Sequence, residues 1–168
     1  MDYLFCDTKL VFDHVPTENE WKDWRNQQLN KLVSSKNGCY VAIFHDKDIR
    51  INNAGKKVLK PLHLHAVIFL KNAMTESAFR AIFKPSRPEN AEPVNSIRSA
   101  TRYILHMTEQ AIEDGKYVYS ESDLWGLVNG STDLKDIRSF YHAKILSHKG
   151  STETATGNEI DLCSDCEC

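Results

Sequence analysis

Short apolar runs separated by polar turns organise the first half of the chain. Residues 4–12 are mostly apolar and predict a first strand, and the segment that opens at Pro16 and Thr17 predicts a helix. Residues 39–44 and 62–70 are rich in strand-forming residues and flank a polar, basic turn, which predicts an antiparallel hairpin. The apolar positions that recur at helical spacing in the predicted helix are Trp21, Trp24, Leu29, Leu32 and Val33.

The second half of the chain continues the alternation. Residues 74–83 predict a short helix and residues 93–97 another strand. Ser96 or Ser99 can cap a helix that runs to about Glu113, followed by an extended segment over 116–119 and a last helix after Ser131. The order β-α-β-β-α-β-α with an added helix predicts an α+β fold, in which helices pack on one face of an antiparallel sheet as in ferredoxin-like and RNA-recognition-like domains.

Length and composition limit the class of protein. With 168 residues, of which 41% are hydrophobic and 26% charged, the chain suits one globular domain and excludes a large multidomain enzyme or a fibrous repeat. We expect the domain to span residues 1–148. The longest apolar run, residues 66–70, is far short of the roughly 20 residues that cross a bilayer. Because the N-terminus also lacks a signal pattern, we expect a cytoplasmic protein with no membrane partner.

Residues 149–168 have a different character. They show no apolar periodicity and carry five acidic side chains against one lysine, so they predict a flexible acidic tail or a truncated linker. The five cysteines do not have the spacing of a disulfide framework, and we expect reduced thiols. Cys163, Cys166 and Cys168 could hold a soft metal, but no fourth ligand lies nearby in the sequence and their role stays open.

The net charge of −2 conceals a basic region. Residues 45–103 carry eleven lysines or arginines against five acidic residues, a net of +6. This stretch therefore favours an anionic partner such as a nucleic acid.

Three histidines and an aspartate lie on the predicted hairpin. His63 and His65 are two residues apart on one strand and so point to the same face, while His45 and Asp48 stand at the end of the other strand. His45 or Asp48 can join the pair around a divalent cation, for which mixed imidazole and carboxylate ligands favour Mn²⁺, with Mg²⁺ or Zn²⁺ as alternatives. The alternative without chemistry is that His63 and His65 are polar residues on the exposed face of a sheet.

Three blocks, in order over about residues 39–125, carry a resemblance to a known family. "HLHAVIFL" resembles the HUH motif (histidine, hydrophobe, histidine) of rolling-circle replication endonucleases, and "FHDKDIR" resembles their upstream metal-binding turn. "SATRYILHMTEQAIEDGKYVYSESDL" is similar to the segment that holds their catalytic tyrosine. The resemblance implies that Tyr103 is the nucleophile and that His45, Asp48, His63 and His65 bind the metal. His106, where related viral proteins usually have lysine, favours the bacterial plasmid type.

The resemblance also implies an activity and partners. The expected function is a metal-dependent, site-specific nickase and strand-transferase of single-stranded DNA, which initiates rolling-circle plasmid replication through a 5′-phosphotyrosine intermediate. Its partners would be replication-origin DNA, with a single-stranded nick site in a hairpin and adjacent duplex repeats, and the host replication machinery. Full initiators of this type commonly carry an oligomerisation domain, so the full-length protein could form a homo-oligomer. The alternatives are a nucleic-acid-binding module without catalysis on the same fold, or a relaxase or transposase of the same superfamily. The candidate DNA contacts are Lys47, Arg50, Arg98, Arg102 and His106. The remaining tyrosines, Tyr117 and Tyr119 included, are interpreted as packing residues.

Overall fold

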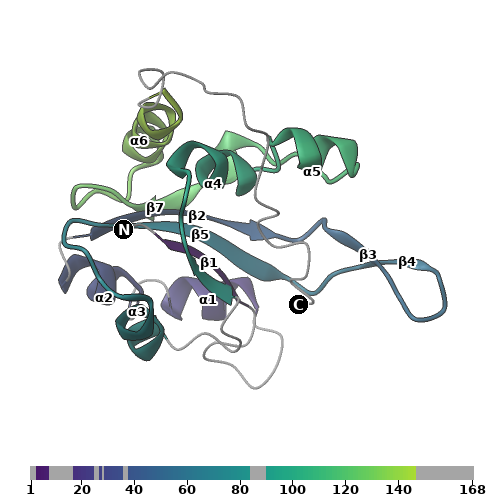
Figure 1. Ribbon diagram of the computed structural model, residues 1–168, viewed down its shortest axis with the longest axis horizontal. Coiled ribbons are helices and arrows are strands. Elements are labelled where there is room, and N and C mark those ends of the chain that lie inside the picture. The colour runs from purple at the N-terminus through teal and green to yellow at the C-terminus, as the bar shows by residue number, and fades with distance from the viewer. Residues whose placement is uncertain are drawn as a thin grey trace.

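The structure is a computed structural model, which describes residues 3–7, 17–24, 27, 29–35, 38–83 and 90–146. Its centre is a five-stranded sheet in which every neighbouring pair is antiparallel, in the order β6-β1-β5-β2-β7 (Figure 1). The strands are β1 (Tyr3–Asp7), β2 (Gly38–His45), β5 (His63–Leu70), β6 (Ala91–Pro93) and β7 (Trp125–Leu127). The predicted α+β class with an antiparallel sheet is confirmed, and so is the hairpin of β2 and β5.

Helices cover both faces of this sheet, whereas the sequence led us to expect them on one face (Figure 1). On one side lie α1 (Glu18–Trp24), α2 (Asn30–Ser35) and α3 (Glu76–Phe83), and on the other α4 (Ile97–Tyr103), α5 (Glu109–Glu113) and α6 (Leu134–Leu146). The reason is visible in β5, which is buried along its whole length because its alternate residues enter two separate cores. A strand that is apolar without alternation is buried on both faces.

Several predicted boundaries change. The helix expected after Pro16 is two short helices, α1 and α2, and the helix expected to reach Glu113 breaks after Tyr103 into α4 and α5. The strand expected at 93–97 ends at Pro93, and β7 was not predicted. Trp21 and Trp24 are buried in the core beneath α1, as expected of packing residues.

The turn of the predicted hairpin is itself structured. β3 (Ile49–Ile51) and β4 (Lys57–Leu59) form a separate two-stranded ribbon that extends beyond the edge of the main sheet (Figure 1). At its tip Asn52 Oδ1 accepts hydrogen bonds from the backbone N–H groups of Ala54 and Lys56, and Gly55 takes a φ of 71°. That left-handed conformation costs glycine little, which explains the residue at this position.

Part of the chain lies outside the described residues. The predicted strand residues 8–12, the expected domain boundary at 148, the acidic tail 149–168 and the three cysteines at 163, 166 and 168 belong to that part. Among the described residues, no helix has the length and apolar character needed to span a membrane.

Candidate metal centre

Strand register brings the three histidines together. His45 is directly opposite His63 across the β2–β5 ladder, and His65 is opposite Ile43. Because side chains alternate along a strand, His45, His63 and His65 share the face that α4 covers. The ligand atoms of these histidines and of Asp48 all lie within 4.8 Å of one another, and all four side chains are buried. The structure thus assembles the four residues that the sequence singled out as ligands.

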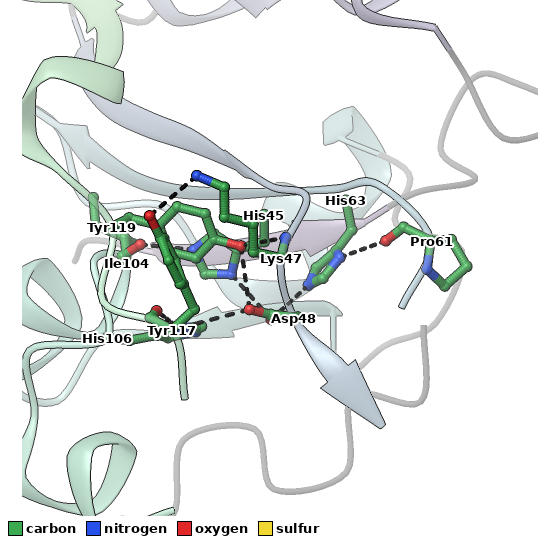
Figure 2. A network of polar contacts seen from close by, with 9 residues as sticks. All are labelled: His45, Lys47, Asp48, Pro61, His63, Ile104, His106, Tyr117 and Tyr119. Carbon is green, nitrogen blue, oxygen red and sulfur yellow. Dashed lines mark hydrogen bonds and ion pairs between the residues drawn. The ribbon is translucent and has the colours of Figure 1, made fainter. Parts of the chain in front are cut away.

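The turn after β2 returns Asp48 to the centre of this group (Figure 2). Its Oδ2 lies 3.3 Å from Nδ1 of His45 and 3.3 Å from Nε2 of His63. The backbone holds the turn in place, because the Lys60 N–H donates a 2.7 Å hydrogen bond to the Asp48 carbonyl. Asp48 is therefore held where the β3–β4 ribbon leaves the main sheet and returns to it.

Backbone carbonyls set the orientation of two imidazoles. Nε2 of His45 lies 2.8 Å from the Ile104 carbonyl and Nδ1 of His63 lies 2.8 Å from the Pro61 carbonyl. A carbonyl only accepts, so each of these nitrogens carries the proton of the neutral ring. The other nitrogen of each ring then turns a lone pair toward the Asp48 carboxylate. Three acceptors that face one point fit a cation between them, and such carbonyl partners are typical of metal-binding histidines.

The charge states also suit metal binding. Burial lowers the pKa of His45, and it lowers the pKa of His65 well below the usual value, so both rings favour the neutral form. Burial alone would raise the pKa of Asp48, but the close approach of His45 and His63 to its carboxylate outweighs burial and holds that pKa below its usual range. Neutral imidazoles and an ionised carboxylate are the protonation states in which these groups bind metal.

Tyr119 supports Asp48 from behind and was missed as a functional residue. Its hydroxyl donates to Oδ1 of Asp48 at 3.3 Å and accepts a 2.9 Å hydrogen bond from the Lys47 backbone N–H. Its ring stacks on His45 with centroids 4.4 Å apart and planes 6° from parallel (Figure 2). Tyr119 therefore orients Asp48 and packs against His45, two of the four candidate ligands. Only its alternation with Tyr117 stood out in the sequence, and that pattern is equally typical of core packing.

His106 lies in the wall of the cluster. Its ring is 1% exposed, its Nδ1 donates to the Tyr117 carbonyl at 2.8 Å and lies 3.7 Å from Oδ1 of Asp48, and its centroid is 4.3 Å from that of His45. The backbone adopts a φ of 56° here, which ends the path of α4 and turns the ring inward. Burial lowers the pKa of His106 to about 4, and the proximity of His45 acts in the same direction.

Tyr103 ends α4 beside the cluster. Its ring centroid is 5.8 Å from that of His65 and 5.9 Å from that of His106. The side chain is 8% exposed, and Nζ of Lys116 lies 5.4 Å above the ring. The structure thus places Tyr103, from the third block, against His65 of the HUH motif. Lys116 adds a cation that the sequence analysis had not selected.

The other basic candidates divide by position. Lys47 is exposed at the edge of the cluster, where its Nζ donates to the Tyr117 hydroxyl at 3.1 Å, and Arg50 is exposed on β3. Arg98 and Arg102 are partly buried on α4, and the Arg102 guanidinium donates to the Met107 carbonyl after the helix. Lys47 and Arg50 are therefore accessible to a ligand, while Arg102 bridges the turn between α4 and α5.

Comparison with known proteins bears on this geometry. A family model described as "Plasmid replication protein, origin binding domain" matches residues 15–151, which include every residue of the cluster and Tyr103. No curated protein matches the chain significantly.

Proposed function

The chain belongs to the family of plasmid replication protein origin-binding domains, and on that premise we propose that it nicks single-stranded origin DNA in a metal-dependent reaction. Membership in the family gives the coarser role, which is binding of replication-origin DNA in plasmid replication initiation. Cleavage goes beyond it. The observation that carries the proposal is the buried group His45, Asp48, His63 and His65 with the Tyr103 ring packed against His65.

The proposed step exchanges one phosphate ester for another. The phenolic oxygen of Tyr103 attacks the phosphorus of the scissile phosphodiester, which forms a bond between that oxygen and phosphorus and breaks the bond from phosphorus to the 3′-oxygen. The phenolic proton leaves to solvent and the departing 3′-oxygen takes up a proton. The products are a 5′-phosphotyrosine and a free 3′-hydroxyl. No bond energy is lost to water, so the reverse attack by a 3′-hydroxyl rejoins the strand.

The cluster is proposed to hold Mn²⁺ through His45, Asp48, His63 and His65, with Mg²⁺ or Zn²⁺ as the alternatives. When bound, a divalent cation supplies a Lewis acid that polarises the scissile phosphate. The residues of the chain do the rest. Ile104 and Pro61 hold two imidazoles by their carbonyl oxygens, Tyr119 orients Asp48, and the Lys116 ammonium next to the Tyr103 ring attracts the phosphate anion.

Two other tyrosines near the cluster are poorer candidates for the nucleophile. Burial raises the pKa of Tyr119, and its hydroxyl is already held between Lys47 and Asp48. Tyr117 is 45% exposed and its hydroxyl accepts from the Lys47 ammonium. This contrast supports the assignment of the attack to Tyr103.

A covalent-adduct assay tests the proposal. Labelled single-stranded oligonucleotides that cover the origin of the replicon encoding the chain are incubated with the protein and Mn²⁺ or with EDTA, then separated on a denaturing gel. We expect a metal-dependent protein–DNA band that Tyr103→Phe abolishes and that Tyr117→Phe, the matched control, retains. A band of equal strength in Tyr103→Phe would refute the assignment.

The second candidate is origin binding without cleavage. The description of the matching family names binding only, which favours this reading. It predicts tight binding of origin DNA with no adduct on any oligonucleotide, with or without metal. The same gel therefore separates the two candidates.

Host replication proteins and further copies of the chain are the remaining proposed partners. The free 3′-hydroxyl would prime the host replication machinery in the cytoplasm, and the full-length protein would act as an oligomer on its origin. Light scattering of the complex with origin DNA tests the second statement, because a single copy per origin would contradict it.

A further inference from the structure

The β3–β4 ribbon presents two different faces. Residues paired across a ladder share a face, and the pairs here are Ile49 with Leu59, Arg50 with Val58, and Ile51 with Lys57. One face therefore carries three large apolar side chains and Lys57, while Arg50 and Val58 point to the other. We call residues 49–60 the ribbon segment.

The large apolar side chains on one face of the ribbon segment are exposed to solvent. Ile49 is 58% exposed, Ile51 69% and Leu59 65%. A short two-stranded ribbon with exposed apolar residues is marginally stable alone and prone to pair with other chains. Such exposure in an element that projects from the domain indicates that a partner covers it (Figure 1).

The charge of the ribbon segment identifies the chemistry of that partner. Its four charged side chains are all cations and it contains no acidic residue. They are Arg50, Lys56, Lys57 and Lys60. An anionic partner is therefore favoured over a second copy of the ribbon, whose four cations would repel these four. A two-stranded ribbon also has the dimensions that the major groove of duplex DNA admits.

The ribbon segment is joined directly to the metal centre at both ends. Asp48 immediately precedes Ile49, the Lys60 N–H donates to the Asp48 carbonyl at 2.7 Å, and the Pro61 carbonyl holds His63 at 2.8 Å. Any DNA bound to the ribbon is thus held at a fixed distance from the cluster. Duplex next to a nick site would occupy such a position.

We propose that the ribbon segment binds duplex origin DNA beside the nick site by entering its major groove. Lys56 and Lys57 contact phosphates, and Ile51 contacts the methyl groups of thymines at the base edges. The position of the nick relative to this duplex rests on the function proposed above. The contact of the ribbon segment with duplex DNA does not depend on that function, because a binding measurement without cleavage tests it.

The phosphate contacts are tested by the salt dependence of binding. Binding of the full chain to a labelled duplex of about two helical turns is measured between about 50 and about 200 mM salt, in the Tyr103→Phe background so that no covalent adduct contributes. For Lys56→Gln/Lys57→Gln we expect the slope of log affinity against log salt to become shallower by about 1.8, or about 0.9 for each lost phosphate contact. Lys135→Gln, at an exposed position on α6, should leave the slope unchanged. An unchanged slope in the double variant would overturn the proposal.

The base contact is tested one methyl group at a time. The full chain first selects its preferred sequence from a pool of random duplexes, and each thymine of that sequence is then replaced by deoxyuridine, which lacks the methyl group. We expect at least one replacement to weaken binding about fourfold, the effect of one buried methyl group. That effect should vanish in Ile51→Ser and persist in Ile112→Ser, whose side chain on α5 is 57% exposed.

Two results would overturn the base contact. Either deoxyuridine has the same effect in Ile51→Ser as in the unmodified chain, or Ile51→Ser leaves DNA binding intact and changes the mass of the particle, which would make the apolar face a protein interface. Failure of the nicking proposal looks different, because it removes the covalent adduct and leaves duplex binding and its dependence on the ribbon segment unaffected.

Discussion

The two ends of one hairpin differ in almost every physical property. At its base the cross-strand pair is His45 and His63, which are 0% and 1% exposed. At its tip the pair is Ile51 and Lys57, and Ile51 is 69% exposed. Only Asp46, Lys47 and Asp48 separate β2 at the base from β3 at the tip. At the base, burial lowers the pKa of His45 and backbone carbonyls fix the orientation of both imidazoles, while at the tip exposure leaves the side chains able to adapt to a partner.

This difference suits the two tasks proposed for the hairpin, metal binding at its base and DNA binding at its tip. A metal ligand must be deprotonated and held within a narrow geometry, which requires burial and hydrogen-bonded partners. A contact to DNA phosphate needs a charged side chain that can extend to the phosphate, which requires exposure to solvent. The base should therefore be sensitive to single-atom changes that the tip tolerates.

The largest expected effect is loss of metal affinity in Asp48→Asn. The substitution removes the only charge among the four ligands and should weaken Mn²⁺ binding about 1,000-fold or more, above the roughly 10- to 100-fold that outer partners of a metal site contribute. Titration calorimetry measures it. Asp46→Asn, exposed and two residues away, is the control and should bind Mn²⁺ as the unmodified chain does. Equal affinity in both variants would place the metal elsewhere.

Acid should destabilise the metal-free chain through its buried histidines. Burial lowers the pKa of His106 to about 4 in the folded chain, whereas an unfolded histidine titrates near 6.5. Between these values the unfolded chain binds more protons, so the free energy of unfolding falls as the pH falls from about 6.5 to about 4, by roughly 3 kcal/mol for this residue. The lowered pKa values of His45 and His65 act in the same direction.

Urea unfolding in EDTA across this pH range measures the effect. His106→Asn, in which asparagine tolerates the left-handed backbone, should show a flatter profile. A metal-free chain whose free energy of unfolding does not change between about pH 7 and about pH 4 would contradict the burial of neutral histidines.

Removing one hydroxyl behind the cluster should have an intermediate effect. Tyr119→Phe deletes the hydrogen bond to Asp48 and should weaken Mn²⁺ binding by about 10- to 100-fold. Tyr117→Phe deletes a hydroxyl of the same chemistry that contacts Lys47, and should leave the metal affinity as it is. If both variants bind the metal equally well, Tyr119 acts in packing alone.

The smallest expected effect belongs to the tip. Ile43→Val, in the buried strand beside the histidines, should lower the free energy of unfolding by about 0.5–1.5 kcal/mol. The identical change in the ribbon, Ile51→Val, should stay within about 0.5 kcal/mol of no effect. Urea unfolding at neutral pH compares them, and a larger loss for Ile51→Val would show that the ribbon is part of the core.

The sequence predicted the part of the site that depends on local rules. Two histidines at i and i+2 on a strand must share a face, and an antiparallel return must bring His45 beside that strand, so the grouping of these three histidines followed from the periodicity of a hairpin. The full set of four candidate ligands, which adds Asp48, came from the resemblance to a known family. The α+β class followed in the same way from the order of helical and strand patterns. Both inferences needed only contacts along and across neighbouring strands.

What escaped prediction depends on distant packing. Tyr119 reaches Asp48 over 71 positions in the chain, and an alternating pair of tyrosines has no signal that points to such a contact. No glycine or proline marks the break of the predicted helix after Tyr103, because His106, at a φ of 56°, makes the turn. The second layer of helices also escaped prediction, although the apolar run of β5 carried its signal, because a strand without polar alternation is buried on both faces.

Mass spectrometry of the covalent adduct would identify the tyrosine that attacks the DNA. Trypsin cleaves after Arg102 and Lys116, so Tyr103 lies on the peptide of residues 103–116, while Tyr117 and Tyr119 lie together on the next one. After the protein reacts with single-stranded origin DNA and Mn²⁺ and the DNA is digested, we expect a nucleotide bound to Tyr103 on the first peptide. A nucleotide on the second peptide would assign the attack to Tyr117 or Tyr119 instead, and an unmodified chain that still binds the DNA would mean that this domain binds its origin without cutting it.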